Sequence, residues 1–380
     1  MASGPAGYRP TMSPDQKFAD GSEPESVEQT RDKAATAPHP EDPRKPDSPS
    51  DLAKPSWRYS LRRALSEFSK DHVTDLAASL TYFAVLSLFP MLLALVSLLG
   101  VFGRGEQTVE GINRWIETYA PAELAELLGD TITGLAGQTG AGLALITGLA
   151  GALWAASGYV GAFSRAMNRI YEVEEGRPIW KHKPQMLALT FVLVLLMAVI
   201  VFALLLSGDL ADTVGAFIGL ADTTVLLWNI AKWPVVVALA VLAVALLYYF
   251  TPNVRQPRFR WISVGAVVAL VVSALAVAAF SVYVANFASY NATYGIIGSV
   301  IVMLLGLWII NNVLLFGAEI DAEIERGRQL QGGIEAEETI KLPPRDTRAS
   351  EKLADKHAAL VDRGRELRLE HGRDHSRDEA

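Results

Sequence analysis

Long apolar runs alternate with short polar connections through most of the sequence, and this alternation predicts helices that cross a membrane. Six runs reach the ~20 residues that a helix needs to span a bilayer. These runs are residues 77–102, 141–163, 185–207, 228–250, 261–285 and 295–318. The pattern therefore predicts an all-α polytopic membrane protein, with a six-transmembrane-helix bundle over residues 54–326.

The two ends of the chain have a different, polar pattern. Residues 1–53 are rich in Pro, Ser, Asp and Glu and have few large apolar side chains, so we expect a disordered tail. Residues 327–380 form a charged tail in which Leu353, Leu360 and Leu367 are spaced by seven. One leucine per heptad favours an exposed helix or disorder, and a coiled-coil contact is the alternative.

The positive charges predict the direction of the spans. Lys and Arg gather before the first span, after the second and after the fourth, and the connections on the other side carry few. Basic connections stay in the cytoplasm, so we expect both termini to be cytoplasmic. The external connection 103–140 is expected to form either a lid on the bundle or an entrance vestibule.

Composition narrows the chemistry further. Hydrophobic residues make up 51% of the 380 residues, and the formal net charge of -7 argues against a nucleic-acid partner. The chain has no cysteine, and none of its six histidines lies in an apolar run. We therefore expect no catalytic site, no metal and no cofactor in the membrane domain, and the chain is not expected to be an enzyme.

Polar residues in the first two spans are candidates for function. Pro90 lies in mid-span, where proline usually kinks a helix; the kink either shapes the bundle or opens a polar cavity near Tyr82. The second span continues into a basic segment that carries Arg165 and Asn168. These two residues are either ordinary inner-face polar residues or part of a site for an anion or a lipid head group.

The last span and the turn before it hold the other candidates. The uncharged segment 286–296 is either a tight helix hairpin or a re-entrant gate, and its candidate residues are Tyr290, Asn291, Tyr294 and Gly295. Asn311 and its neighbour Asn312 lie in the span, where an amide is costly unless it is paired. Glu319 is our candidate for an ion-paired or proton-linked carboxylate, with Arg165 as its expected partner.

Four segments together resemble a known family. They are AASLTYFAVLSLFP (77–90), ALWAASGYVGAFSRAMNRIYEVEEGRPIWK (152–181), LYYFTPN (247–253) and SVYVANFASYNATYGIIGSVIVMLLGLWIINNVLLFGAEIDAE (281–323). In these segments the chain is similar to the YihY/BrkB family of bacterial inner-membrane proteins. The resemblance implies six membrane helices, cytoplasmic termini and a place in the bacterial inner membrane. It also marks Tyr82, Pro90, Asn168, Tyr290, Asn291, Tyr294, Gly295 and Glu319 as positions of the family pattern.

Polar residues inside the membrane without a catalytic set favour one class of function. We expect a transporter or permease-like protein, for a lipid or other amphiphile, without nucleotide hydrolysis of its own. The alternative is a membrane scaffold that recruits partners through its tails. A ribonuclease label also exists in the family, but the chain lacks the residues that would activate water. Membrane lipids are the expected partners, and a homo-oligomer is left open.

Overall fold

The computed structural model describes residues 25–102, 110, 114, 142–205, 222–257, 259–286 and 291–378. Every regular element within these residues is a helix, which confirms the all-α class. The elements are α2 (Glu25–Thr36), η2 (Pro49–Asp51), α3 (Lys54–Lys70), α4 (Val73–Phe102), α7 (Gly142–Ile170), α8 (Ile179–Leu205), α10 (Asp222–Phe250), α11 (Phe259–Asn286), α12 (Asn291–Gln331) and α13 (Arg348–Asp378).

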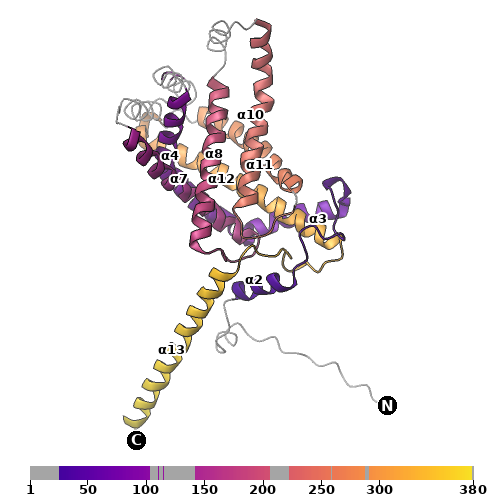
Figure 1. Ribbon diagram of the computed structural model, residues 1–380, viewed down its shortest axis with the longest axis vertical. Coiled ribbons are helices and arrows are strands. Elements are labelled where there is room, and N and C mark those ends of the chain that lie inside the picture. Colours follow the sequence, from indigo (N-terminus) through magenta and orange to yellow (C-terminus); the bar gives the residue numbers. More distant parts are fainter. Residues whose placement is uncertain are drawn as a thin grey trace.

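The long helices α4, α7, α8, α10, α11 and α12 form one bundle (Figure 1). Within it α4 packs mainly on α7, and α11 packs mainly on α12. The shorter α3 lies along α12. Helix α2 lies below the bundle, and α13 extends away from it as a separate rod (Figure 1).

Four helical segments are long and apolar enough to cross a membrane: Ile179–Leu204, Ile230–Phe250, Val264–Val284 and Val300–Gln331. They correspond to the third to sixth predicted spans. The first two predicted spans fall on α4 and α7, which have 30 and 29 residues. In α4 the side chains are described as far as Leu88, and this stretch, Val73–Leu88, is apolar. The chain is a helical membrane protein, and the number of six spans stays a prediction.

The apolar core lies where α4, α7, α10 and α12 meet. Phe163 of α7 stacks on Tyr248 of α10, with ring centroids 6.1 Å apart and an interplanar angle of 11°. Met167 and Leu315 are also fully buried in this cluster. Packing of these large side chains holds α7, α10 and α12 together, and so positions the polar residues at the ends of these helices.

Residues 25–53, which we call the strap, do not match the expected disorder. The strap runs across one end of the bundle and buries Val27, Lys33, Lys45 and Leu52. The composition argument failed because it counts apolar side chains, whereas the strap is held largely by lysines that reach buried oxygen atoms. Of the predicted charged tail, Arg348–Asp378 forms α13 with exposed leucines, whereas Ile340 and Leu342 before it are buried in the core.

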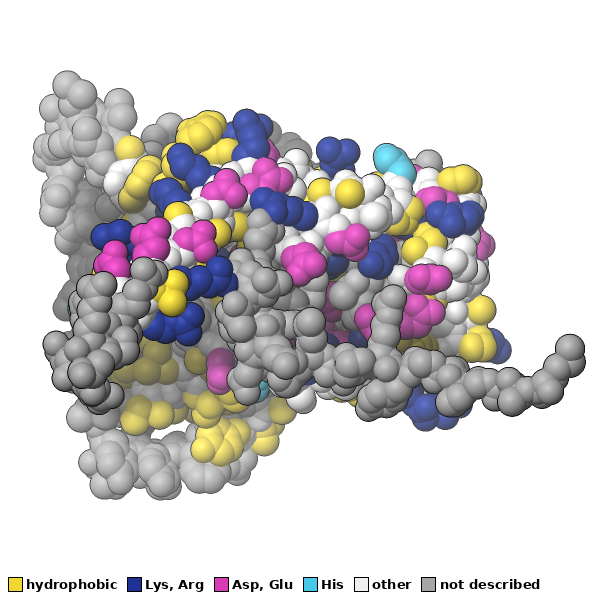
Figure 2. Space-filling view, turned by 90° about the horizontal axis from the view of Figure 1, so that it is seen from below, with side chains coloured by type: hydrophobic (Ala, Val, Ile, Leu, Met, Phe, Trp, Pro, Cys, Tyr) yellow, Lys and Arg dark blue, Asp and Glu magenta, His cyan; other side chains and the backbone are white. Residues whose placement is uncertain are grey.

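Three other segments lie at the same end of the bundle as the strap. These are the connections 171–178, 251–257 and 332–347. We call this the capped end. Seen from below, the end carries acidic and basic side chains side by side (Figure 2). The capped end and the adjacent parts of α7 and α12 contain four of the candidates: Arg165, Asn168, Asn311 and Glu319.

Candidate functional site: a buried polar network and the capped end

Asn311 joins three helices inside the bundle. Its Nδ2 donates to Thr81 Oγ1 of α4 at 3.1 Å, and its Oδ1 accepts from the Tyr159 hydroxyl of α7 at 2.8 Å. The side chain is only 3% exposed. Its neighbour Asn312 bonds within its own helix, donating to the Trp308 carbonyl oxygen at 2.8 Å. Of the two amides, Asn311 is therefore the one that ties helices together.

Two acidic residues lie further along α12, toward the capped end. Glu319 is 1% exposed and Asp321 is 5% exposed. Asp321 Oδ1 accepts from the backbone N–H of Gly265 at 2.7 Å. Among the described residues, Glu319 Oε1 and Asp321 Oδ2 are buried without a hydrogen-bond partner. Each carboxyl group therefore retains an oxygen atom that could take up a proton or accept a donor group.

The expected ion pair between Glu319 and Arg165 is wrong. Arg165 is exposed, and its Nη1 donates to the Gly161 carbonyl oxygen at 3.2 Å. Its guanidinium lies over the Phe83 ring, 5.3 Å from the centroid. Arg165 thus points along the outside of α7, because the 3.6-residue period turns this position away from the side on which α12 packs.

Asn168 holds two connections of the capped end together. Its Oδ1 accepts from the backbone N–H of Asn253 at 2.7 Å, and its Nδ2 donates to Glu175 Oε2 at 3.0 Å. Asn253 in turn donates through Nδ2 to the carbonyl oxygens of Glu174 and Asp346, both at 2.8 Å. The amide of Asn168 therefore positions loops, and it is not directed at an open cavity.

Arg177 is the central cation of this end, and the sequence pattern did not single it out. It is 5% exposed and bonds both oxygen atoms of Glu175, at 2.8 and 2.7 Å. Its Nη2 also donates to the Thr251 carbonyl oxygen and to Ser164 Oγ. Burial alone would raise the pKa of the Glu175 carboxyl, but Arg177 holds that pKa below its usual value. The sequence shows Arg177 only as one of several basic residues in a connection.

A second set of ion pairs attaches the strap to α12. Lys33 Nζ lies 3.5 Å from Glu172 Oε2, and Arg326 Nη2 lies 3.0 Å from Glu172 Oε1. Lys45 Nζ lies 2.8 Å from Glu325 Oε1. Burial lowers the pKa of the Lys33 ammonium to about 8, although the nearby Glu172 acts in the opposite direction. These pairs cross between segments that are far apart in the sequence, so they close the capped end.

Tyr82 does not join this network. Tyr82 is 62% exposed and packs edge-on against Phe83, so it faces away from the bundle interior, and no polar cavity forms at this side chain. Pro90 lies within α4, and Asn291, Tyr294 and Gly295 lie in the first turns of α12. Tyr290 falls outside the described residues, so the choice between hairpin and re-entrant loop stays open.

Metal binding has no support in the described part of the chain. None of its groups of His, Asp and Glu side chains has three members placed to hold an ion. The chemistry that this site offers is therefore that of amides, hydroxyls, buried carboxyl groups and ion pairs.

Comparison with known proteins agrees with a membrane bundle. The family model described as virulence factor BrkB matches residues 64–340. The ribonuclease-like protein YfkH of Bacillus subtilis is 29% identical over 71% of this chain and 96% of its own length. A UPF0761 membrane protein of Alteromonas mediterranea is 26% identical over 66% of this chain and 82% of its own length.

Some relatives are longer than this chain. A UPF0761 membrane protein of Rhodospirillum rubrum is 30% identical over 66% of this chain, which covers 56% of that protein. No solved structure matches the chain. The family model covers far more than half of the chain, and the chain therefore belongs to the virulence factor BrkB family.

Proposed function

We propose that this protein is a transporter or permease-like membrane protein for a lipid or other amphiphile. The observation that carries the proposal is the pair of buried carboxyl groups, Glu319 and Asp321, each with an oxygen atom that has no partner among the described residues. They follow the Asn311 network along the same helix. Ionisable groups inside membrane domains are costly and often mark the path of a substrate or a proton.

If Glu319 and Asp321 only filled space in the bundle, apolar residues would be expected at these two positions. Burying a carboxylate costs several kcal/mol unless a partner compensates for it, and an apolar side chain of similar size would pack there at least as well. A carboxyl group with a free oxygen atom is useful to a protein that must bind and release a proton or a donor group. The two buried carboxyl groups therefore favour a role in transport driven by a gradient, and not a role in packing alone.

The capped end supports the same proposal. Its ion pairs connect the strap, the 171–178 connection and α12, so passage through this end requires several of them to separate. Transporters alternate between two arrangements of rigid parts, and ion pairs that join separate segments are suitable as a closed gate. The sequence has no glycine-rich phosphate loop, so the energy would come from a gradient and not from bound nucleotide.

Two pairs of variants test the proposal in cells that lack the native protein. Asn311→Leu removes the contacts between helices, and Asn312→Leu is its matched control on the next residue. Glu319→Gln removes the buried carboxyl, and Glu337→Gln is an exposed control. We expect Asn311→Leu and Glu319→Gln to insert at near-normal levels, measured by immunoblot of membranes, and to lose complementation of the deletion phenotype.

The controls should complement fully. If Asn311→Leu and Glu319→Gln complement as well as their controls at matched expression, the transport proposal loses the observation on which it depends.

A scaffold that recruits partners is the second candidate, and α13 is the feature that favours it. This helix leaves the bundle, and its Leu353 and Leu360 are 65% and 72% exposed. Deletion of residues 348–380 separates the two candidates. A transporter should keep its phenotype without α13, and a scaffold should lose it.

Ribonuclease activity is the remaining possibility, because the relative YfkH is named ribonuclease-like. We expect purified protein not to hydrolyse RNA above background, since the described residues have no metal-binding group to activate water. Activity that persists through every purification step and disappears with a point substitution in residues 54–326 would contradict this expectation.

A further inference from the structure

An apolar groove runs between α3, α11 and α12. Its volume is about 560 Å³, and its walls include Trp57 and Leu61 of α3, Val264 and Val268 of α11, and Ile320 of α12. We call it the α3 groove. A volume of this size accepts a stretch of hydrocarbon chain, and its apolar walls offer little else to a ligand.

The rim of the α3 groove is basic. Lys54 and Arg58 lie at the groove, and a second, shallower hollow beside it is lined by Arg58, Arg62 and Arg63. Arg63 is paired with Glu67 at 3.0 Å and lies 3.5 Å from Glu323. That pairing removes Arg63 from the set of available charges.

Three basic residues at the rim remain available to a ligand. Lys54, Arg58 and Arg62 are exposed, and the structure gives none of them a hydrogen bond or ion pair within its described residues. Three positive charges beside an apolar groove match a molecule with an anionic head and an apolar tail.

Helix α3 is built to lie at a membrane surface. Leu61 and Leu65 are 53% and 58% exposed, and they alternate along the helix with Arg58 and Arg62. Exposed leucines and arginines on one short helix are typical of helices that lie in the interface plane of a membrane. The opposite side of α3 packs on α12, so α3 is held beside the spans.

The α3 groove opens at the height where α11 enters the apolar layer. Val264 is both a wall of the groove and the first residue of the apolar segment of α11. Beyond it the outer side of α11 is exposed at Val267, Val271 and Leu275, as expected of a surface in contact with lipid. A lipid in the adjacent leaflet therefore has its phosphate at the level of the basic rim and its chain at the level of the groove.

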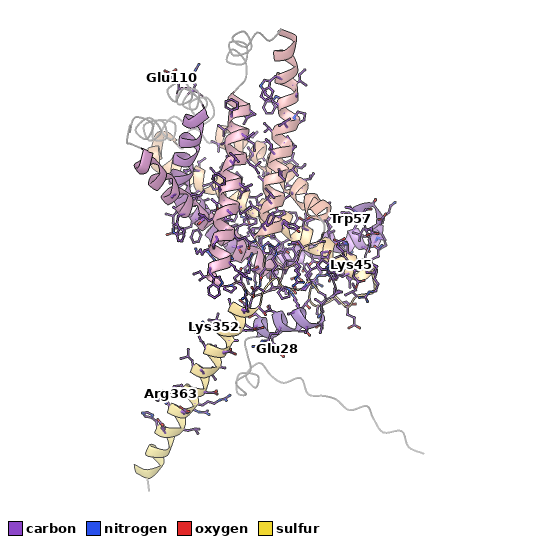
Figure 3. The ribbon with its side chains drawn as sticks, viewed as in Figure 1. Glu28, Lys45, Trp57, Glu110, Lys352 and Arg363 are labelled. Carbon is purple, nitrogen blue, oxygen red and sulfur yellow. The ribbon has the colours of Figure 1, made fainter. Side chains whose placement is uncertain are left out.

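From these observations we infer that the α3 groove binds one anionic phospholipid from the membrane. Its phosphate is bound by Lys54, Arg58 and Arg62, and one acyl chain lies against Trp57, Val264 and Val268. Figure 3 shows Trp57 on the same side of the capped end as Lys45, at the edge of the bundle. This inference goes beyond the proposed function, because a resident lipid binds at this place even if the protein transports something else.

The test measures lipid binding to the full chain in detergent, by native mass spectrometry. Delipidated protein is titrated with phosphatidylglycerol and, separately, with phosphatidylcholine of the same acyl chains. We expect one phosphatidylglycerol to bind with clear preference. The double variant Lys54→Gln/Arg58→Gln should bind it about thirtyfold more weakly, because each of the two basic residues near the lipid head group contributes ~1 kcal/mol.

Two further variants make the result specific to this groove. Lys352→Gln/Lys356→Gln makes the same change of charge on the exposed face of α13 and should bind phosphatidylglycerol as the native protein does. Val268→Trp fills the groove without a change of charge and should also weaken binding. Thermal unfolding of each variant without lipid shows that a loss of binding is not a loss of fold.

Three outcomes would overturn the inference. The first is equal binding of the two lipids by the native protein. The second is an equal loss in the α13 control and the rim variant. The third is a preference for phosphatidylglycerol that appears only after residues 1–24 are deleted. That result would mean that residues 1–24, and not a lipid, occupy the groove in the full chain. These binding measurements do not depend on whether the protein is a transporter, so a failure of the transport proposal would not change them.

Discussion

Asp71 illustrates how a single buried charge can oppose folding. It lies between α3 and α4, and burial raises the pKa of its carboxyl to about 6. Arg169, at 3.4 Å, opposes this rise, and Glu67 and Glu172 add to it. The folded protein therefore keeps the proton at pH values where the unfolded chain has lost it. Through this group, stability falls as pH rises from about 4 to about 6 and then stays level.

We expect Asp71→Asn to stabilise the protein at pH 7.5, because the variant has no charge to bury. The gain in melting temperature over the native protein should shrink as pH falls below 6 and should be absent near pH 4. Thermal unfolding in detergent across this range measures it. A gain that is the same at every pH would show that the amide stabilises by some other contact.

Glu172 is a residue on which two buried cations depend. It accepts from Arg326 at 3.0 Å and lies 3.5 Å from Lys33 Nζ. We predict that Glu172→Gln lowers the free energy of unfolding by about 1.5–3 kcal/mol, the usual value of a hydrogen bond to a charged group. Glu174→Gln is the control in the same connection, and it should change stability little. Equal unfolding curves for the two variants would contradict the role of Glu172.

Single residues also show what the sequence could and could not predict. An amide side chain inside a membrane needs a hydrogen-bond partner, so the sequence predicted that an asparagine of the last span faces the bundle interior. Asn311 does so. The pairing of Glu319 with Arg165 failed, because spacing along the chain does not say on which side of a neighbouring helix a residue lies. Arg177 could not be found, since the carbonyl oxygen of Thr251 that it binds comes from a connection 74 residues away.

At the scale of elements, α11 and α12 approach each other through glycines. A Cβ atom on Gly265 would lie 2.4 Å from the Gly317 carbonyl oxygen, and one on Gly317 would lie 2.8 Å from the Gly265 carbonyl oxygen. Small residues allow such contact between membrane helices, where lipid provides no hydrophobic drive for association. The same contact allows the Gly265 backbone N–H to reach Asp321.

Gly265→Ala should therefore destabilise the bundle by about 1–3 kcal/mol, the usual cost of extra atoms in a packed site. Gly151→Ala is the matched control, because a Cβ there meets nothing within 4 Å. The control should be neutral or slightly stabilising, since alanine favours a helix. Chemical unfolding in mixed micelles compares the two. If both variants are neutral, the helices do not depend on this close contact.

Elements were predicted well where the apolar pattern is long and poorly where it is short. The third to sixth spans follow from runs of apolar residues that leave few alternatives. The strap escaped prediction because its order comes from contacts such as Lys45 with Glu325, which are 280 residues apart. No local pattern in residues 25–53 contains that information.

For the whole molecule, the connections at 175 and 257 and the end of α12 near 330 gather at the capped end. Glu110 lies at the opposite end from Lys45 (Figure 3). Together with the basic connections, this arrangement predicts that reporters fused after residues 175, 257 and 330 are cytoplasmic. Reporters near 120, 215 and 289 should be external.

Paired fusions to alkaline phosphatase and a fluorescent protein give opposite signals on the two sides and provide the measurement. An external reporter at residue 257 would contradict the six-span arrangement. It would also place the capped end on the other side of the membrane.

The strap has a consequence for how the protein is made. Its lysines leave the ribosome long before the residues that receive them: Glu172 for Lys33, and Glu325 for Lys45. Domains otherwise tend to form from the N-terminus during synthesis. Here the strap must remain in water until α12 has been inserted. Closure of the capped end must therefore follow the insertion of α12, and only a chain that has been threaded through the membrane at least as far as Glu325 can complete it.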